Sequence, residues 1–516
     1  MTWLILSAML SDPRMQDVDK SPQSSFIDSR PVVNDNMERN GNLLISGAIM
    51  VLPEATRTGD LRIAGGIITE IGEVGTLENL DDEMFVDGTG LHLLPGCIDP
   101  QVHFRDPGQP EKEDLGSGSA AGVSGGITSF LDMPNNVPSI TTLEGMQGKL
   151  DTAANLCVSN YGFFIGATED NVKDLQDAVG TKENPIAIPG ICGIKIFMSM
   201  SVGPLLVSNK TALERIFTET AGLIAVHAED QDRMNERKKL IEGRTDVAAH
   251  AYYRDDITAL LATKFAVEMA HKTGHRLHIL HLTSGIEADY LVDHCVLPSK
   301  AEGHPIITTE VLPQHLTFDE NDVNEHGVRL QMNPPIRYTA DREILWKRLF
   351  DGTIQCIATD HAPHTLEAKQ KGFPNAPSGM PGVETSLPVM LDYVNQGRCS
   401  IEDVVRWMST NVADCYRMIG KGKLEVGYDG DVVLVDMNHS AVVEDKNSWA
   451  RVKWNPFHGR ELTGWPVLTV VEGIPVFERS DGTGQKGRLL VEPGSVGKPL
   501  LLSLIHISEP TRPDEI

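Results

Sequence analysis

The sequence is poor in cysteine and in aromatic residues, and it has no disulfide-like or zinc-finger-like pattern. Its seven cysteines are odd in number, scattered along 516 residues and never arranged as CxxC, and aromatic residues make up only 5% of the chain. These features argue against a disulfide framework and against a cysteine-type zinc site. We therefore expect reduced thiols and a cytoplasmic protein.

Positive charge and long apolar runs are also scarce. The chain has 45 Lys and Arg against 72 Asp and Glu, a formal net charge of −27. A uniformly negative surface is repelled by phosphates, so we expect neither a nucleic-acid partner nor an anionic membrane surface. No stretch reaches the roughly 18 uninterrupted apolar residues of a membrane-spanning helix. A local basic pocket for a small anion remains compatible with this balance.

Both ends of the chain differ from its middle. Residues 1–41 are predicted to be a disordered extension, with a secretory signal as the alternative, and Met37 is a candidate natural start because the ordered pattern begins near Asn42. The last stretch, LLSLIHISEPTRPDEI (501–516), resembles the translation of a common sequencing adapter. We expect it to be a non-native tail, the alternative being an ordinary C-terminal tail.

The middle of the chain alternates short apolar runs with segments of helical period. With 41% hydrophobic residues, the chain can bury a large core. The eight apolar runs lie at 91–104, 127–134, 161–168, 193–198, 223–229, 276–283, 305–313 and 354–360. Apolar strands alternating with helices indicate a parallel sheet covered by helices, and eight of them fit a closed barrel. We predict an α/β fold, a (β/α)₈ TIM-like barrel over residues 94–424, with a doubly wound open sheet as the alternative.

One of the helices can be placed closely. Its apolar residues fall on one helical face, and a glycine stands where a C-terminal cap is wanted. These residues are Ile257, Leu260, Leu261, Phe265 and Met269, followed by Gly274.

The segments on either side of the predicted barrel have a different texture. Residues 42–93 and 425–480 contain short strand-like runs separated by glycine and Asp-Gly turns. Two β-rich pieces that flank a barrel most simply fold together. We therefore predict one small β-sandwich domain built from the N- and C-terminal segments.

Polar side chains stand at or near the carboxyl ends of five predicted barrel strands. They are His103, Lys195, His227, His281 and Asp360. The carboxyl ends of barrel strands form the active face, and three imidazoles with a carboxylate suit a divalent ion such as Zn²⁺. A single strand histidine is more often a hydrogen-bonded core residue. Five such groups on one rim instead favour a metal site.

Lys195 needs a separate argument, because an ammonium group has no lone pair for a metal. Burial in the apolar run GIKIFM (193–198) should lower its pKa. A neutral amine can take up CO₂ to become a carbamate, which is a bridging carboxylate. The alternative is a buried lysine paired with an acid; the surrounding ligand set favours the carbamate.

Seven motifs together resemble the dihydroorotases of the amidohydrolase superfamily. They are GCIDPQVHFRDPG (96–108), FLDMPNN (130–136), VHAED (226–230), ILHLTS (279–284), TTEVLPQHL (308–316), MNPPIR (332–337) and ATDHAPH (358–364). The resemblance implies reversible cyclisation of N-carbamoyl-L-aspartate to dihydroorotate in pyrimidine biosynthesis. Allantoinases and hydantoinases (dihydropyrimidinases) share the metal frame and remain the alternative.

The resemblance also implies roles for the rim residues. His103 and Asp360 would bind one zinc ion, His227 and His281 a second, and carbamylated Lys195 would bridge the two. Asp360 would in addition carry the proton during catalysis. One or two zinc ions per chain are therefore expected.

Further residues would hold the substrate. By resemblance, Arg105, Asn135, Asn333 and His364 contact its carboxylate, and the glycine-rich segment 371–385 contacts its ring. Allantoinases usually have asparagine where Arg105 stands. A guanidinium offers a two-pronged contact for a carboxylate, which a neutral hydantoin does not need. Arg105 therefore favours dihydroorotate as the substrate.

Two positions depart from the family pattern. Gln101 stands where the HxH motif has its first histidine, and Gln314 replaces the first histidine of PHHL, although His315 remains. An amide oxygen is a weaker zinc ligand than imidazole, so we predict a weaker first metal site. Gln101 also leaves open a non-catalytic scaffold for aspartate carbamoyltransferase. We expect a homo-oligomer in either case.

Overall fold

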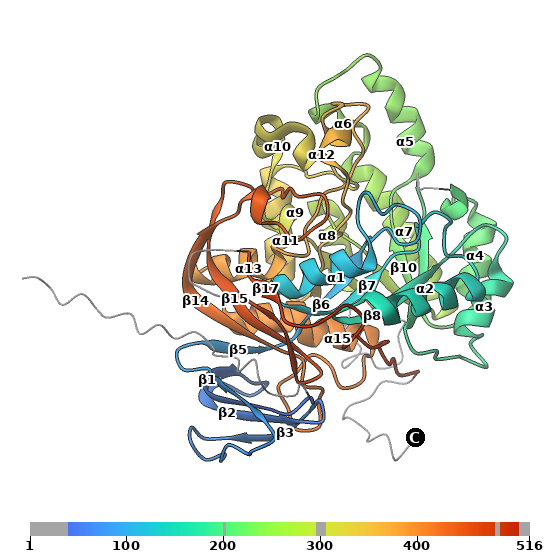
Figure 1. Cartoon of the computed structure of the whole chain (residues 1–516). Helices are drawn as coiled ribbons and strands as arrows, with labels where there is room; N and C mark the ends of the chain where they lie inside the picture. The colour runs from blue at the N-terminus through green and yellow to red at the C-terminus, as the bar shows by residue number, and fades with distance from the viewer. Residues whose placement is uncertain (1–39, 200–202, 296–305, 480–485, 505–516) are drawn as a thin grey trace, which may run out of the picture.

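The computed structural model describes residues 40–199, 203–295, 306–479 and 486–504 (Figure 1). Most of the predicted N-terminal extension and the tail beyond residue 504 lie outside these ranges. Among the residues described, no helix combines the length and the hydropathy needed to cross a lipid bilayer.

Eight parallel strands form a barrel within the described residues, in the order in which they occur along the chain. They are β6 (Cys97–Val102), β7 (Ile127–Asp132), β8 (Asn160–Gly166), β9 (Ile191–Phe197), β10 (Leu223–His227), β11 (Arg276–Ile279), β12 (Ile307–Val311) and β13 (Cys356–Ile357). A parallel bridge between Val102 and His361 brings the last strand back to the first, and His103 N donates to His361 O at 2.8 Å. The predicted TIM-like barrel is therefore confirmed.

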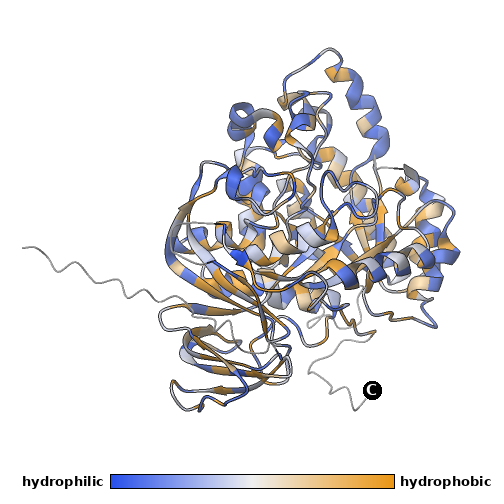
Figure 2. Ribbon diagram, viewed as in Figure 1, coloured by the Kyte–Doolittle hydropathy of each residue, from blue (hydrophilic) through white to orange (hydrophobic). Residues whose placement is uncertain are grey.

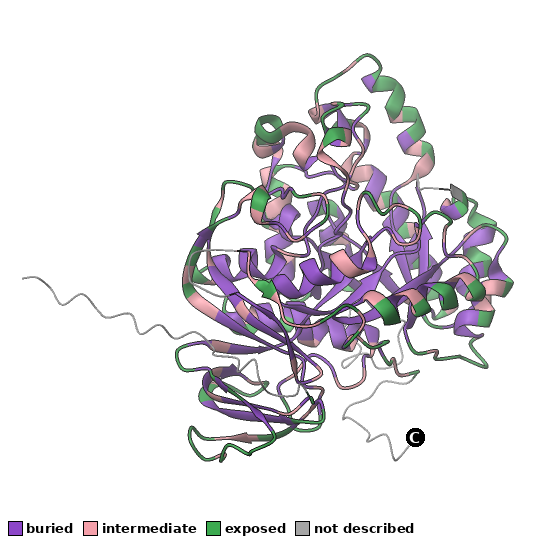
Figure 3. Cartoon of the chain, in the orientation of Figure 1, coloured by how far each residue is buried: buried purple, intermediate pink, exposed green. Residues whose placement is uncertain are grey.

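The barrel strands are buried on both faces, as parallel strands covered by helices must be. Every residue of β7, β8 and β9 is buried. Figure 3 shows these strands in purple, with exposed residues gathered on the outer helices, and Figure 2 shows the same strands as largely hydrophobic. Burial on both sides explains why their sequences are continuous apolar runs rather than alternating ones.

Helices connect and surround the strands. They are α1 (Leu115–Ser124), α2 (Leu143–Leu156), α3 (Val172–Val179), α4 (Lys210–Glu219), α5 (Gln231–Lys238), α6 (Ala248–Tyr253), α7 (Asp256–Thr273), α8 (Gly285–Tyr290), α9 (Pro313–Thr317), α10 (Glu320–His326), α11 (Thr339–Phe350), α12 (Leu366–Lys369), α13 (Ser386–Asn395), α14 (Ile401–Val405) and α15 (Asn411–Tyr416).

Helix α7 ends as predicted but turns a different face inward. Gly274 caps it with φ 67°, in the left-handed region that favours glycine. The predicted apolar face is not the most buried one, because Leu261 is 44% exposed while Ala259, Ala262 and Ala266 are buried. Small side chains let the helix approach its neighbours closely, and hydropathy alone does not reveal that preference.

The two flanking segments form a second, mostly antiparallel sheet, as predicted for a composite domain (Figure 1). Its strands are β1 (Leu43–Val51), β2 (Thr56–Ala64), β3 (Ile67–Gly72), β4 (Met84–Asp87), β5 (His92–Pro95), β14 (Val432–Val442), β15 (Glu461–Val471), β16 (Ile474–Glu478) and β17 (Arg488–Leu489). Strand β5 lies between β1 and β14, so the N- and C-terminal segments meet in the middle of the sheet. The start of the predicted tail packs back on the chain, since Ile419 N donates to Leu501 O at 3.0 Å.

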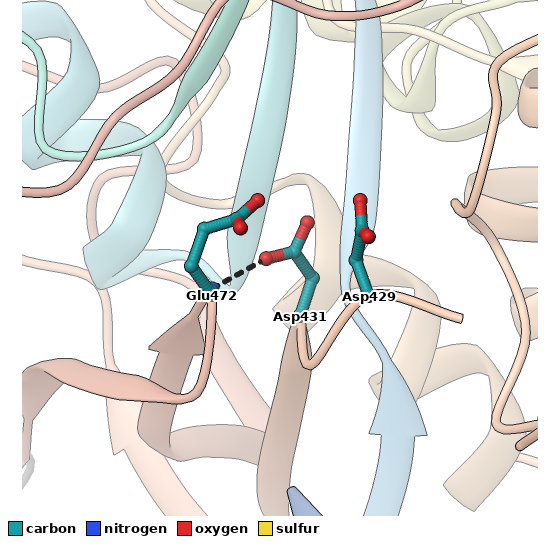
Figure 4. Close-up of side chains that lie close together, drawn as sticks. All are labelled: Asp429, Asp431 and Glu472. Atoms are coloured by element: carbon teal, nitrogen blue, oxygen red, sulfur yellow. Dashed lines mark hydrogen bonds between the residues drawn. The ribbon is translucent and has the colours of Figure 1, made fainter. Parts of the chain in front are cut away.

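A buried ion cluster joins this sheet to the barrel. Figure 4 shows Asp429, Asp431 and Glu472 turned toward one another, and Glu472 N donates to Asp431 Oδ1 at 2.8 Å. Their spacing would suit a cation. The cation is Lys421, whose Nζ lies 2.7, 2.6 and 3.1 Å from the three carboxylates. Asn160 at the start of β8 donates to Asp431 Oδ2 at 2.9 Å, which ties the cluster to the barrel.

Replacing Lys421 with methionine should destabilise the protein strongly. The variant leaves the buried Asp431 and the partly buried Asp429 without their counter-charge, whereas Glu472 keeps its pair with Lys498. Breaking a buried pair in this way costs about 3–5 kcal/mol. Lys423→Met is the matched control, because Lys423 is partly exposed and lies 3.9 Å from Glu425. Denaturant unfolding measures the difference. Equal stability of the two variants would show that Lys421 is not the counter-ion of the cluster.

Candidate active site

The five predicted rim residues are all buried, and four of them lie in two close pairs. His103 Nε2 lies 2.9 Å from Asp360 Oδ1, although the residues are far apart in sequence. His227 Nδ1 lies 3.0 Å from His281 Nε2. Zn–N bonds of about 2.0–2.1 Å place two tetrahedral ligand atoms roughly 3.3 Å apart, so both spacings are close to those of two ligands on one ion.

Lys195 lies on β9 with its side chain fully buried, and its Nζ has no hydrogen-bond partner within the described part of the chain. Burial lowers the pKa of this lysine to about 7. Its charge acts on Asp360 from the first pair and on His227 and His281 from the second. The neutral amine needed for carbamate formation is therefore accessible near neutral pH.

Both histidines of the second pair are neutral. Burial lowers the pKa of His227, and burial followed by the neighbouring His227 lowers that of His281 well below its usual value. A neutral imidazole keeps one lone pair, which is the form that binds a metal. Glu229 Oε2 lies 2.7 Å from His227 Nε2. Because a carboxylate only accepts, Nε2 carries the proton and Nδ1 keeps the lone pair.

The first pair is oriented by two amides. Asn135 Oδ1 lies 2.5 Å from His103 Nδ1, so the ring donates there and keeps its Nε2 lone pair toward Asp360. Gln101 Nε2 donates to Asp360 Oδ1 at 3.2 Å, while Gln101 Oε1 is buried without a partner. The amide oxygen that stands in for an imidazole is thus available as a ligand.

Three residues of the site adopt left-handed backbone conformations. Arg105 has φ 62°, His281 φ 38° and Asp360 φ 47°, and all three lie just beyond the ends of their strands. For residues with a side chain this region is uncommon and costs free energy, so it persists where the surroundings enforce it. The conformations aim a guanidinium, an imidazole and a carboxylate in directions that an extended strand would not allow.

Arg105 is a buried cation that forms no salt bridge with a carboxylate among the described residues. It is 5% exposed, its Nε has no partner, and its side chain makes no hydrogen bond among the described residues. Burial lowers the pKa of Arg105 to about 10, although Asp360, Asp132 and Glu113 act in the opposite direction. The guanidinium remains charged at neutral pH, and a buried charge of this kind is stabilised by an anionic partner.

The other predicted substrate residues already have protein partners. Asn333 Oδ1 lies 2.9 Å from His250 Nε2, and His364 Nε2 lies 3.1 Å from Ser378 O in the glycine-rich segment. Burial, followed by the charge of Arg105, lowers the pKa of His364, so this ring is neutral. Their predicted contacts with a substrate carboxylate stay predictions.

Several residues that support the site were not identified from the sequence. Lys369 Nζ donates to the carbonyl oxygens of Gln331, Pro377 and Gly379 at 2.9, 3.1 and 2.9 Å and so fixes the glycine-rich segment. Glu229 and Arg254 were missed too. Glu229 had one available signal, since it follows His227 by two residues in VHAED. Gln314, which stands in for a histidine, donates to Thr359 O instead of joining the rim pairs.

Comparison with known proteins agrees with this fold. Residues 92–476 match the model of the Amidohydrolase family. A dihydroorotase of Halobacterium salinarum is 33% identical over 84% of this chain and 96% of its own. An allantoinase of Streptomyces avermitilis is also 33% identical, over 87% of this chain and 98% of its own.

Among solved structures, the L-hydantoinase (dihydropyrimidinase) of Arthrobacter aurescens aligns with a TM-score of 0.80 and 26% identity, covering 89% of this chain and 99% of that one. The chain belongs to the amidohydrolase family. Together with the family, these relatives, a dihydroorotase, an allantoinase and a hydantoinase, show that it is a cyclic amide hydrolase. Because the chain is 33% identical both to a dihydroorotase and to an allantoinase, sequence identity does not decide which of their substrates it hydrolyses.

Proposed function

We propose that the protein is a dihydroorotase, which interconverts N-carbamoyl-L-aspartate and (S)-dihydroorotate in cytoplasmic pyrimidine synthesis. The observation that carries this proposal is Arg105, a buried guanidinium that interacts electrostatically with Asp360 and pairs with no carboxylate among the described residues. Dihydroorotate has a carboxylate to satisfy it, whereas allantoin and simple hydantoins have none. A desolvated cation favours the anionic substrate and penalises a neutral one.

The donor set fits a divalent metal, because neutral imidazoles, a carboxylate and an unpartnered amide oxygen converge on one rim. His103 and Asp360 would hold one zinc ion, His227 and His281 a second, and Lys195 would bridge them as its carbamate. A bound ion of this kind lowers the pKa of water and polarises a carbonyl oxygen.

The side chains of this protein then have defined tasks. Arg105 holds the substrate carboxylate, which fixes the ring carbonyl over the rim and makes attack effectively unimolecular. Asp360 Oδ1 accepts a hydrogen bond from Gln101 Nε2, and Asp360 Oδ2 makes none among the described residues. Asp360 Oδ2 takes the proton from the attacking water. It returns this proton to the ring nitrogen as the C–N bond breaks, which leaves N-carbamoyl-L-aspartate.

Turnover of dihydroorotate, allantoin and hydantoin by the purified protein tests the proposal. We expect dihydroorotate to have the highest kcat/KM. Arg105→Gln should raise KM for dihydroorotate roughly 10–150-fold, since losing a charge-assisted hydrogen bond costs about 1.5–3 kcal/mol. Bound metal should not change. Arg215→Gln, on the exposed side of α4, is the control.

Two outcomes would count against this assignment. Preference for allantoin by the parent would instead favour an allantoinase, the class of the Streptomyces relative. An unchanged KM in Arg105→Gln would remove Arg105 as the carboxylate contact. A homo-oligomer and an association with aspartate carbamoyltransferase stay predictions.

A further inference from the structure

A buried ion pair lies directly behind His227. Glu229 Oε2 is 2.7 Å from His227 Nε2. Arg254 binds the same carboxylate, because its Nε donates to Glu229 Oε1 at 3.1 Å and its Nη2 pairs with Glu229 Oε2. All three side chains are almost completely buried. Glu229 follows the end of β10, whereas Arg254 follows α6, so the pair joins the segments that follow these two elements.

The contacts continue from Arg254 to the rest of the site. Arg337 donates to Arg254 O at 2.7 Å and to Thr283 Oγ1 at 2.8 Å. Thr283 lies two residues beyond His281. The surroundings of both histidines of the second pair are therefore tied into one buried hydrogen-bonded network.

This arrangement determines which nitrogen of His227 is free. The Glu229 carboxylate can only accept, so it selects the form of the ring with the proton on Nε2 and the lone pair on Nδ1, toward His281. Without this acceptor, the proton is free to occupy either nitrogen and the ring is free to turn. Arg254 holds both oxygens of Glu229 and so fixes the position of the acceptor.

We propose that Glu229 and Arg254 are positioning residues that hold His227 with Nδ1 toward His281, and that they thereby set the affinity of this histidine pair for a divalent metal. The inference rests on the metal site of the proposed function. Carboxylates that accept from a ligating histidine typically contribute 10–100-fold to metal affinity, which gives the expected size of the effect.

Competition between the metal-free protein and a chelator for Zn²⁺ measures the affinity without reference to activity. Glu229→Gln keeps an acceptor for His227 but loses the charge, and we expect zinc binding about 10-fold weaker. The double variant E229M/R254M removes the acceptor, and it leaves no unpaired buried charge that would unfold the protein. We expect its zinc binding to be up to about 100-fold weaker, with near-parent thermal stability.

Glu287→Gln is the matched control. Glu287 is a buried carboxyl group that contacts Thr263 and Ser284 and, within the described residues, no histidine. The zinc affinity of the Glu287→Gln protein should therefore equal that of the parent. The visible spectrum of the Co²⁺-loaded proteins provides a second readout. We expect the double variant to change the cobalt bands, because the geometry of His227 changes, and Glu287→Gln to leave them as in the parent.

The outcomes separate the inference from the proposed function. If the parent binds no divalent metal, both the proposed metal site and this inference are wrong. If the parent binds zinc and a folded E229M/R254M variant binds it equally well, only the inference is overturned. Weaker zinc binding in E229M/R254M than in Glu229→Gln, with Glu287→Gln unaffected, supports it.

Discussion

Lys195→Ala is expected to abolish nearly all hydrolysis and to lower the zinc content of the protein. Lys195 is buried, its Nζ has no hydrogen-bond partner among the described residues, and its lowered pKa makes the amine available for carbamate formation. Alanine removes the side chain that we propose to bridge the two ions. The loss of kcat should exceed the roughly 100-fold that an outer partner of a metal ligand contributes.

Lys195→Arg separates the two possible roles of this side chain. Arginine keeps the positive charge and most of the length, but it stays protonated and cannot form the carbamate. If Lys195 acts as a carbamate, both variants lose zinc and activity. Added acetate should restore part of the activity of Lys195→Ala, because it supplies a carboxylate to the vacated space. An active Lys195→Arg would show that Lys195 acts as a cation instead.

His281→Gln is expected to remove most of one zinc ion per chain and most of the activity. Its Nε2 is one half of the second ligand pair, and an amide is a poorer zinc ligand than a neutral imidazole. His278→Gln is the matched control. His278 is buried on β11, three residues before His281, but its ring contacts Thr308 and Glu310 rather than His227. Metal analysis after dialysis measures the result.

Equal zinc content in His281→Gln and His278→Gln would contradict the assignment of His281. Loss of zinc from both would instead indicate that the variants unfold locally, which denaturant unfolding would detect. Because both are buried histidines only three residues apart, the contrast between the two variants tests the position of the imidazole rather than the residue type.

The barrel was predictable because its physical signal is local and repeated. Parallel strands covered on both faces must be apolar throughout, and eight such runs alternate with helices in the sequence. The rim followed from the same logic, since the ends of parallel strands meet at one edge. The pairing of His103 with Asp360 is the clearest case, because the last strand closes against the first.

The supporting contacts were not predictable in the same way. Arg254 reaches Glu229 across 25 residues, and no periodicity in the sequence encodes that hydrogen bond. The left-handed φ of Arg105 also could not be predicted from the sequence, because arginine does not favour that conformation. Residue type at a strand end identifies a site, whereas the orientation of its side chains depends on tertiary contacts.

The position of β5 in the second sheet has a consequence for how the chain is made. Val433 pairs with Leu94, and the whole barrel lies between them in sequence. A ribosome adding about 5–20 residues per second needs on the order of 20–70 seconds to synthesise that interval. During this time the edge of β5 that later pairs with β14 is unprotected. The emerging protein should therefore depend on chaperones until its last strands leave the ribosome.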